Sequence, residues 1–237
     1  MADIVIATPW AGLGDHLQFS TLPELYSKQG HTVWLHKDAP FRNKEIRKFV
    51  WGTNPYVAGF TDLPPNAGGG FAHVRHVTDS IVSDWEVAHG FGVQNHYPKL
   101  YFEPDTDGLQ FQDTILIDLT CVSDTYDRHK LHDAVFRIIE DDKYYRKLKH
   151  RQVLFTGTNI FTEEHPLLGE DARVTHIHSL EHYADALSNC AGIITLMSGA
   201  AVLASTLKGD TGNQRIDVIM AQDKPIFKFR NAKYTVL

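Results

Sequence analysis

Short apolar runs alternate with amphipathic stretches along the chain. Residues 3–7 form the first run, of the kind found in buried parallel strands. A glycine-rich turn follows, and residues 16–29 then carry apolar positions at roughly helical spacing, ending at Gly30. Residues 32–36 (TVWLH) are the next predicted strand. The order strand, turn, helix, strand predicts a βαβ unit, which implies a parallel sheet with right-handed crossovers.

The rest of the first half is less regular. Residues 43–51 and 79–90 have the pattern of short helices. Proline, asparagine and glycine dominate residues 64–70, so we expect a loop there. Residues 103–113 are polar and rich in Asp, Gly and Gln, which is typical of a linker.

The second half repeats the alternation without repeating the sequence. Strands are expected at residues 114–119, 152–156, 192–196 and 216–220, the last of the chain, and helices over 131–142, from Ser179 and from Ser198. The predicted fold class is therefore α/β, with two small Rossmann-like domains facing each other across a cleft. We place the first at residues 1–106 and the second at residues 107–237.

Composition narrows the class of protein. The 237 residues are 43% hydrophobic and 22% charged, with a net charge of −6, so neither nucleic acid nor an anionic membrane is favoured as a bulk partner. No run approaches the ~20 apolar residues of a membrane span, and the N-terminus lacks the basic region of a signal peptide. We expect a cytoplasmic protein without a membrane span. The histidine pairs at 73/76, 129/132 and 176/178 lack the Cys or Glu partners of a zinc site, so no metal is expected.

The turn after the first strand is the first candidate for chemistry. Gly12 and Gly14 allow a ligand to approach the backbone closely, but Leu17 interrupts the dinucleotide-binding pattern G-x-G-x-x-G. Asp15 follows directly at the start of the predicted helix. It either caps free amide groups there or faces a cleft as a general base, and the sequence leaves both roles open.

The second candidate is the turn at Ser198, Gly199 and Ala200, where a strand ends and a helix begins. Amide groups at such a helix end favour anions such as a diphosphate. Small residues serve tight packing of helix on strand equally well, so both interpretations stand.

Taken together, these segments resemble the glycosyltransferase family that includes the lipopolysaccharide heptosyltransferases (glycosyltransferase family 9), which have a two-domain GT-B fold. Residues 12–17 (GLGDHL) are similar to its opening G-x-G-D turn, and residues 54–57 (NPYV) to a recurring NPYV/HPYI segment. Residues 97–101 (YPKLY) look like the piece that closes its first domain. Residues 179–204 resemble its S-L-x-E helix, the following strand and the D-[ST]-G-x-x-H-x-A-A motif.

The resemblance implies an inverting, metal-independent transfer of a sugar from a nucleotide-sugar donor to an acceptor hydroxyl, with no further cofactor. Asp15 would be the catalytic base of an acceptor-binding N-terminal domain, and the C-terminal domain would hold the donor. The implied acceptor-binding residues are Gly12, Leu13, Gly14 and His16. The implied donor-binding residues are Arg128, Lys130, Thr156, Gly157, Thr158, Ser198, Gly199 and Ala200. The resemblance leaves the sugar, the nucleotide base, the acceptor and the oligomeric state open.

Two positions depart from the family pattern. Met197 stands where the family has Asp, and Val202 where it has His. A non-catalytic nucleotide-sugar or glycan-binding protein is therefore an alternative, as is a sugar-nucleotide epimerase or hydrolase of the same fold. The basic and aromatic run at residues 143–151 also raises modified DNA as an acceptor, although a solvated helix face is the more usual explanation of such a run.

Overall fold

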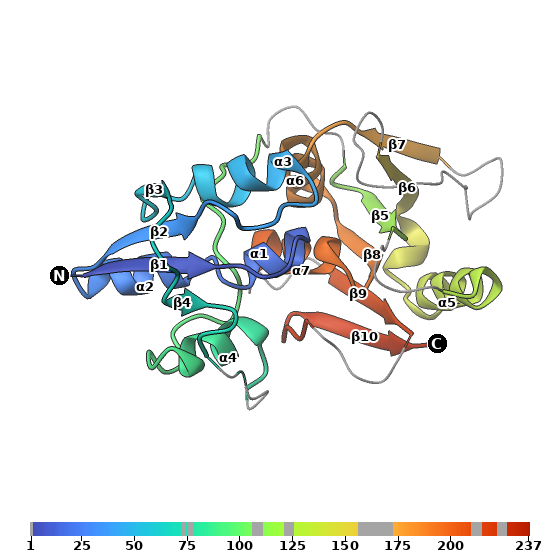
Figure 1. The fold of residues 1–237 in the computed structure, drawn as a ribbon. Helices are drawn as coiled ribbons and strands as arrows, with labels where there is room; N and C mark the ends of the chain where they lie inside the picture. The colour runs from blue at the N-terminus through green and yellow to red at the C-terminus, as the bar shows by residue number, and fades with distance from the viewer. Residues whose placement is uncertain are drawn as a thin grey trace. The chain divides into compact units, whose positions relative to one another are not determined.

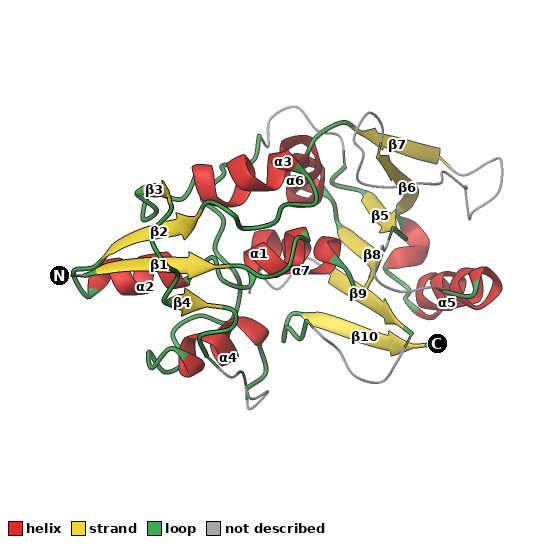
Figure 2. Cartoon of the chain, viewed as in Figure 1, coloured by secondary structure: helices red, strands yellow, loops and turns green. Residues whose placement is uncertain are grey.

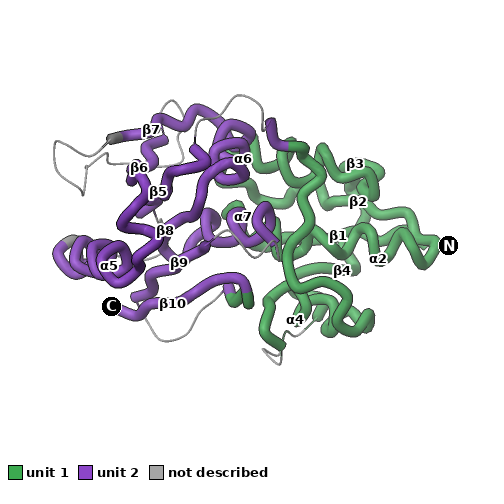
Figure 3. The backbone as a smooth tube through the Cα atoms, turned by 180° about the vertical axis from the view of Figure 1, so that it is seen from behind, with its two compact units in different colours: residues 1–103, 228–230 green, residues 104–227, 231–237 purple. Residues whose placement is uncertain are grey.

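The computed structural model describes residues 2–72, 74, 78–105, 111–120, 126–155, 173–209, 215–221 and 227–237. These residues form two compact units (Figure 3). Unit 1 comprises residues 1–103 and 228–230, and unit 2 comprises residues 104–227 and 231–237. The chain thus leaves unit 1 a few residues before the boundary expected at 106/107, and it returns there briefly near its end.

Unit 1 is built on a four-stranded parallel sheet in the order β3-β2-β1-β4 (Figure 1). Its elements are β1 (Asp3–Ala7), α1 (Leu13–Leu17), α2 (Leu22–Lys28), β2 (Thr32–His36), α3 (Lys44–Ile46), the π-helix η1 (Arg47–Gly52), β3 (Gly59–Thr61), β4 (Ala67–Gly68) and α4 (Ile81–Ala88). The buried core of this sheet includes Val5, Ile6, Val33 and Leu35 from the two central strands.

Two expectations for unit 1 were wrong. Residues 16–29 do not form one helix: they hold the end of α1 and the whole of α2. Pro23 lies in the first turn of α2, where its missing amide costs nothing, whereas a continuous helix would need that amide. The expected loop at 64–70 contains β4, whose Ala67 and Gly68 pair with Ile6 and Ala7. A strand of two residues has no periodicity that a sequence pattern can show.

Unit 2 is built on a six-stranded parallel sheet in the order β10-β9-β8-β5-β6-β7 (Figure 2 shows the strands in yellow). Its elements are β5 (Thr114–Asp118), α5 (Arg128–Asp141), the 3-10 helix η2 (Tyr145–Lys147), β6 (Lys149–Phe155), β7 (Arg173–Ile177), α6 (Leu180–Asn189), β8 (Gly192–Leu196), α7 (Gly199–Lys208), β9 (Arg215–Met220) and β10 (Ala232–Val236). The α/β class with two parallel sheets is confirmed.

The sequence did not indicate the outer strands of this sheet. β7 and β10 lie at its two edges, and β10 follows the strand at 216–220 that was expected to be the last. Edge strands pack on one neighbour only and are partly exposed, as β10 is, so they lack the continuous apolar run of the buried strands. The helix expected over 131–142 begins three residues earlier, because Asp127 caps the amides of His129 and Lys130.

The run at residues 143–151 does not form a helix face. It forms η2 and the start of β6, and Tyr145 within it is fully buried, with its hydroxyl donating to the Asp217 carboxylate over 2.5 Å. Lys149 pairs with Asp113 over 2.7 Å. Tyr145 is therefore unavailable to a ligand, whereas Lys143, Tyr144, Arg146 and Lys147 beside it are exposed.

The extended segment at 97–101 is fastened to α2 of unit 1. The Lys99 amide donates to Ser20 Oγ over 2.9 Å, and Lys99 Nζ and the Tyr101 hydroxyl both donate to Glu24. Hydrogen bonds from Lys28 and Lys99 outweigh the effect of burial and lower the pKa of Glu24 to about 2. The buried Glu24 carboxylate, which accepts from Lys28, Lys99 and Tyr101, thus holds the segment at 97–101 against α2.

Candidate functional site

The order in which the strands are added reverses beside β1 in the first sheet, although all its strands run parallel. From β1 the chain crosses over to β2 on one side, and β4 later pairs with β1 on the other side. Ligands of open parallel sheets bind where the carboxyl ends of such strands diverge. The residues that follow β1, and those that follow Gly68, therefore line the first candidate position.

Asp15 lies in this position. Its Oδ2 accepts a hydrogen bond of 3.0 Å from the amide of Gly12, which caps the first turn of α1. A Cβ atom on residue 12 would come within 2.7 Å of the same oxygen, so glycine is required for this contact. No residue in the described ranges donates a hydrogen bond to the other oxygen, Oδ1, which leaves it able to accept a proton from a ligand.

Two opposing influences act on the pKa of Asp15. Burial raises the pKa above its usual value, while the Gly12 amide and the charge of Arg42 lower it less strongly. Arg42 is exposed and is tied to the turn through its backbone amide, which donates to Ala11 over 2.9 Å. A carboxyl group whose pKa is shifted toward neutrality is a better base near neutral pH than an ordinary aspartate.

His16, expected to bind the acceptor, is fully buried. The indole of Trp51 can only donate, so its 2.9 Å contact with Nδ1 places the ring proton on Nε2, which donates to Pro40 over 2.9 Å. Burial lowers the pKa of His16 to about 4, so the ring is neutral at physiological pH. Its stacking on Phe41 completes the enclosure. We therefore assign His16 to supporting the Asp15 turn and not to ligand contact.

Aromatic residues support the turn from the side of α4. Gln18 Nε2 donates to the backbone oxygen of Asp15 over 3.1 Å, and Gln18 Oε1 accepts from the indole of Trp85 over 2.8 Å. Trp85 and Phe19 are buried with their rings 4.6 Å apart, and Trp10 lies against both. The sequence analysis missed this group, although the spacing of Gln18 from Asp15, one helical turn, was a usable signal.

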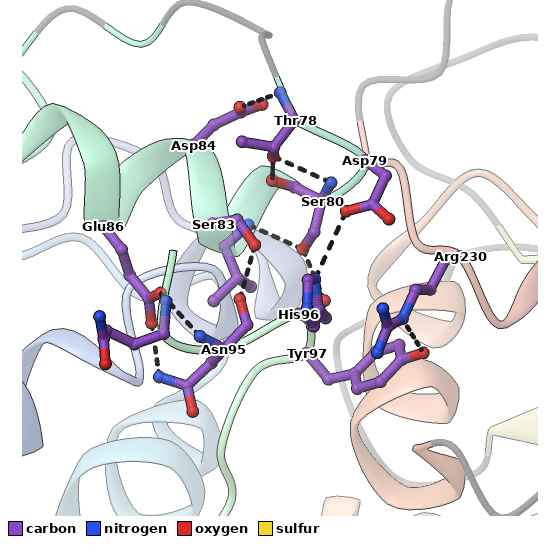
Figure 4. A network of polar contacts seen from close by, with 12 residues as sticks. Thr78, Asp79, Ser80, Ser83, Asp84, Glu86, Asn95, His96, Tyr97 and Arg230 are labelled. Atoms are coloured by element: carbon purple, nitrogen blue, oxygen red, sulfur yellow. Dashed lines mark hydrogen bonds and ion pairs between the residues drawn. The ribbon is translucent and has the colours of Figure 1, made fainter. Parts of the chain in front are cut away.

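A polar network fixes α4, which carries Trp85 (Figure 4). Ser80 caps the helix, and its hydroxyl donates to the backbone oxygen of His96 over 2.6 Å. The Ser83 hydroxyl donates to the backbone oxygen of Asn95 over 2.6 Å, and the Glu86 carboxylate accepts from the Asn95 amide over 2.8 Å. These bonds tie the helix to the loop at 90–97, so the Trp85 side chain has a defined position.

In the second sheet the strand order reverses between β5 and β8, which are neighbours in the sheet. Ser198 follows β8 and caps α7, its Oγ accepting from the Ala200 amide over 3.2 Å. Ser198 and Gly199 are partly exposed, whereas Ala200 is buried. The amide of Ala200, expected to bind a diphosphate, is thus occupied by the cap, while the described residues offer no acceptor to the amide of Gly199.

The carboxylate beside this position, that of Asp118, is buried and bonded to other residues of unit 2. Asp118 ends β5, is buried, and accepts hydrogen bonds from the amide and hydroxyl of Thr120 and from the hydroxyl of Tyr183. Burial raises its pKa in spite of these donors. Met197 and Val202, the two departures from the family pattern, are both core residues. No polar side chain stands at either of these two positions.

The remaining expected donor residues are only partly described. Arg128 and Lys130 lie in the first turn of α5, not in the preceding loop, and Lys130 is exposed. Thr156, Gly157 and Thr158 lie outside the described residues. Within the described ranges, no group of three His, Cys, Asp or Glu side chains has a metal-binding arrangement, and no helix is long and apolar enough to cross a membrane.

The fold is shared with solved glycosyltransferase structures. A glycosyl transferase family 9 protein from Veillonella parvula aligns with 100% of this chain and 85% of its own, with a TM-score of 0.64 and 12% identity. The E. coli ADP-heptose lipopolysaccharide heptosyltransferase II aligns with 99% of this chain and 90% of its own, with a TM-score of 0.59 and 10% identity.

A third structure is similar over a smaller part of its length. The iron-containing dodecameric glycosyltransferase TibC from enterotoxigenic E. coli aligns with 99% of this chain but 62% of its own, with a TM-score of 0.64 and 13% identity.

Neither a sequence family nor a curated protein matches the sequence. The resemblance to heptosyltransferases is therefore confirmed at the level of the fold.

Proposed function

We propose that the protein is a glycosyltransferase that moves a sugar from a nucleotide-sugar donor to an acceptor hydroxyl, with inversion at the anomeric carbon and without a metal ion. The observation that carries the proposal is the Asp15 carboxylate. It is held at the carboxyl end of the central strand by the Gly12 amide, its pKa is raised, and its Oδ1 accepts no hydrogen bond from a described residue. The fold shared with glycosyltransferases supports the same function.

In this mechanism Asp15 takes the proton of the acceptor hydroxyl while the acceptor oxygen attacks the anomeric carbon. The bond from that carbon to the diphosphate oxygen breaks, and its electron pair leaves with the nucleotide diphosphate. The attack comes from the face opposite the leaving group, so the configuration inverts. The amides at the start of α7 and the cations at the start of α5 are suited to the charge that develops on the diphosphate.

The base assignment is tested by Asp15→Asn. The amide keeps the size of the side chain but cannot take the proton, so we expect transfer to fall ~10²-fold or more while nucleotide affinity is unchanged. Asp62→Asn is the matched control, because Asp62 is exposed and forms an ion pair with Lys37 on the surface. Transfer from UDP-, ADP-, GDP- and CDP-sugars is measured by donor consumption, and a wild-type rate in Asp15→Asn would refute the assignment.

The pH profile gives an independent reading of the same group. Since the base must be ionised, the transfer rate should rise with pH and level off above the pKa of Asp15. Because burial raises that pKa, the rise should lie above the range of an ordinary aspartate. A rate already constant from pH 4 upward would contradict an Asp15 base.

A second candidate is a binding protein without transferase activity. The residues at positions 197 and 202 favour it, because a methionine and a valine offer a donor no carboxylate or imidazole. Calorimetry with UDP, ADP, GDP and CDP, combined with the donor-consumption assay, separates the two. Binding of a nucleotide without consumption of any donor sugar would favour the binding protein.

A further inference from the structure

Trp10 is an exposed indole on a rigid aromatic support. The residue is 47% exposed, although tryptophan is usually buried to a large extent. The indole is parallel to the ring of Phe19, with centroids 6.4 Å apart, and is tilted against Trp85 at 6.5 Å. Both supporting residues are buried, and Trp85 is further held by its hydrogen bond to Gln18.

The backbone that carries Trp10 is also fixed. Gly69, which follows β4, approaches Pro9 so closely that a Cβ on residue 69 would come within 2.5 Å of the proline ring. The Gly69 amide donates to the backbone oxygen of Ala7 over 3.0 Å. The end of β4 therefore packs against the residue before Trp10. An exposed side chain held this firmly loses little entropy when a ligand covers it.

A second exposed aromatic residue follows the neighbouring strand, β4. Ala7 and Gly68 are register partners in β1 and β4, and each is followed three residues later by an exposed aromatic ring, Trp10 and Phe71. Both rings thus belong to the carboxyl edge of the sheet where its strand order reverses. Gly12, two residues beyond Trp10, donates the hydrogen bond that positions Asp15.

We propose that Trp10 is a stacking platform for a pyranose ring of the acceptor, which places a hydroxyl of that ring at Asp15. The inference rests on the proposed transferase function and adds the chemical class of the acceptor. One face of a pyranose carries C–H groups that pack on an aromatic ring, and its rim carries hydroxyls that a carboxylate accepts. A nucleotide offers a base for stacking too, but the main-chain amides and cations suited to its diphosphate belong to unit 2, whereas Trp10 belongs to unit 1.

The four tryptophans of the chain make a direct test possible. Protein labelled with 5-fluorotryptophan gives one fluorine resonance each for Trp10, Trp34, Trp51 and Trp85, assigned by single substitutions to phenylalanine. The probes are the methyl α- and β-pyranosides of glucose, galactose and mannose. We expect at least one of them to shift the Trp10 resonance saturably, with no shift of Trp51, which is buried and bonded to His16.

Variants measure the contribution of the ring. Trp10→Ala should weaken binding of that pyranoside about three- to tenfold, whereas Trp10→Phe, which keeps an aromatic face, should retain most of the affinity. Phe136→Ala is the matched control, because Phe136 is an exposed aromatic residue on α5 and should leave affinity unchanged. Circular dichroism confirms that each variant is folded.

The outcomes separate the inference from the proposed function. If no pyranoside shifts Trp10, or if UDP or ADP shifts it and the pyranosides do not, the platform is refuted. If a donor is consumed but Trp10→Ala leaves the KM for the acceptor unchanged, the transferase stands and the platform falls. If pyranosides bind at Trp10 but no donor is consumed, the platform stands and the transferase falls.

Discussion

The aspartates at the two positions where the strand order reverses, Asp15 and Asp118, have opposite hydrogen-bonding environments. Asp15, beside β1 and β4, is half-buried and bonded through one oxygen to one amide. Asp118, at the end of β5, is buried and bonded to Thr120 and Tyr183 through both oxygens. Burial raises the pKa of both groups. The pKa direction therefore does not distinguish a reactive carboxylate from a structural one, whereas the number of internal donors does.

The residues around Asp15 and those around Asp118 also differ in exposure. The first position carries an exposed cation, Arg42, and an exposed aromatic ring, Trp10. At the second position Met197 and Tyr183 are core residues, and Ser198 caps its helix. Among the described residues, unit 1 thus offers a carboxylate and an exposed aromatic ring, whereas unit 2 offers main-chain amides and the exposed Lys130. This division is the one expected if unit 1 carries the base and unit 2 the anion site.

Among substitutions that leave Asp15 itself in place, Gly12→Ala should produce the largest effect on transfer. The new Cβ would lie 2.7 Å from Asp15 Oδ2, so the carboxylate must move away from its amide donor. A displacement of about 1 Å costs on the order of 10²-fold in rate, and we expect a loss of this size in kcat/KM. Gly52→Ala is the control, since a Cβ there meets only ordinary contacts at 3.8 Å or more. An unaffected rate in Gly12→Ala would show that the position of Asp15 is not critical.

Tyr183→Phe tests the structural role of Asp118. Removing the hydroxyl leaves a buried carboxylate one donor short, which should lower the free energy of unfolding by about 2 kcal/mol. Urea denaturation measures the change, and Tyr144→Phe, at an exposed tyrosine, should be neutral. Asp15→Asn should leave the unfolding free energy nearly unchanged. If it destabilised the protein as much as Tyr183→Phe does, the contrast between the two carboxylates would be lost.

Ser198→Ala should have the smallest effect of the three. The variant loses the cap of α7, which costs about 1 kcal/mol of stability, and it frees the Ala200 amide. If that amide binds the donor diphosphate, calorimetry should show nucleotide affinity that is equal to or higher than that of the wild type. Ser179→Ala, which removes the cap of α6, is the control for lost capping alone. A nucleotide affinity reduced more than tenfold would instead place the Ser198 hydroxyl itself on the ligand.

The sequence predicted the parts of the fold that depend on neighbours along the chain. The strands at 3–7, 32–36 and 192–196 were predicted correctly because each is a short, mostly apolar segment. The serine that starts α6 and the one that starts α7 were recognised because capping is a local hydrogen bond. β3, β4, β7 and β10 were missed, since a short strand or an edge strand owes its existence to the strand beside it.

The candidate site divides in the same way. Gly12 and Asp15 are readable from sequence, because the glycine and the carboxylate that it bonds are three residues apart. Tertiary structure alone decided that His16 is enclosed by Trp51 and that Trp10 is left exposed. It also decided the strand orders, and with them the points at which each sheet reverses. These features depend on contacts between residues far apart in the chain, and no local pattern encodes which of two adjacent polar or aromatic side chains the folded core will cover.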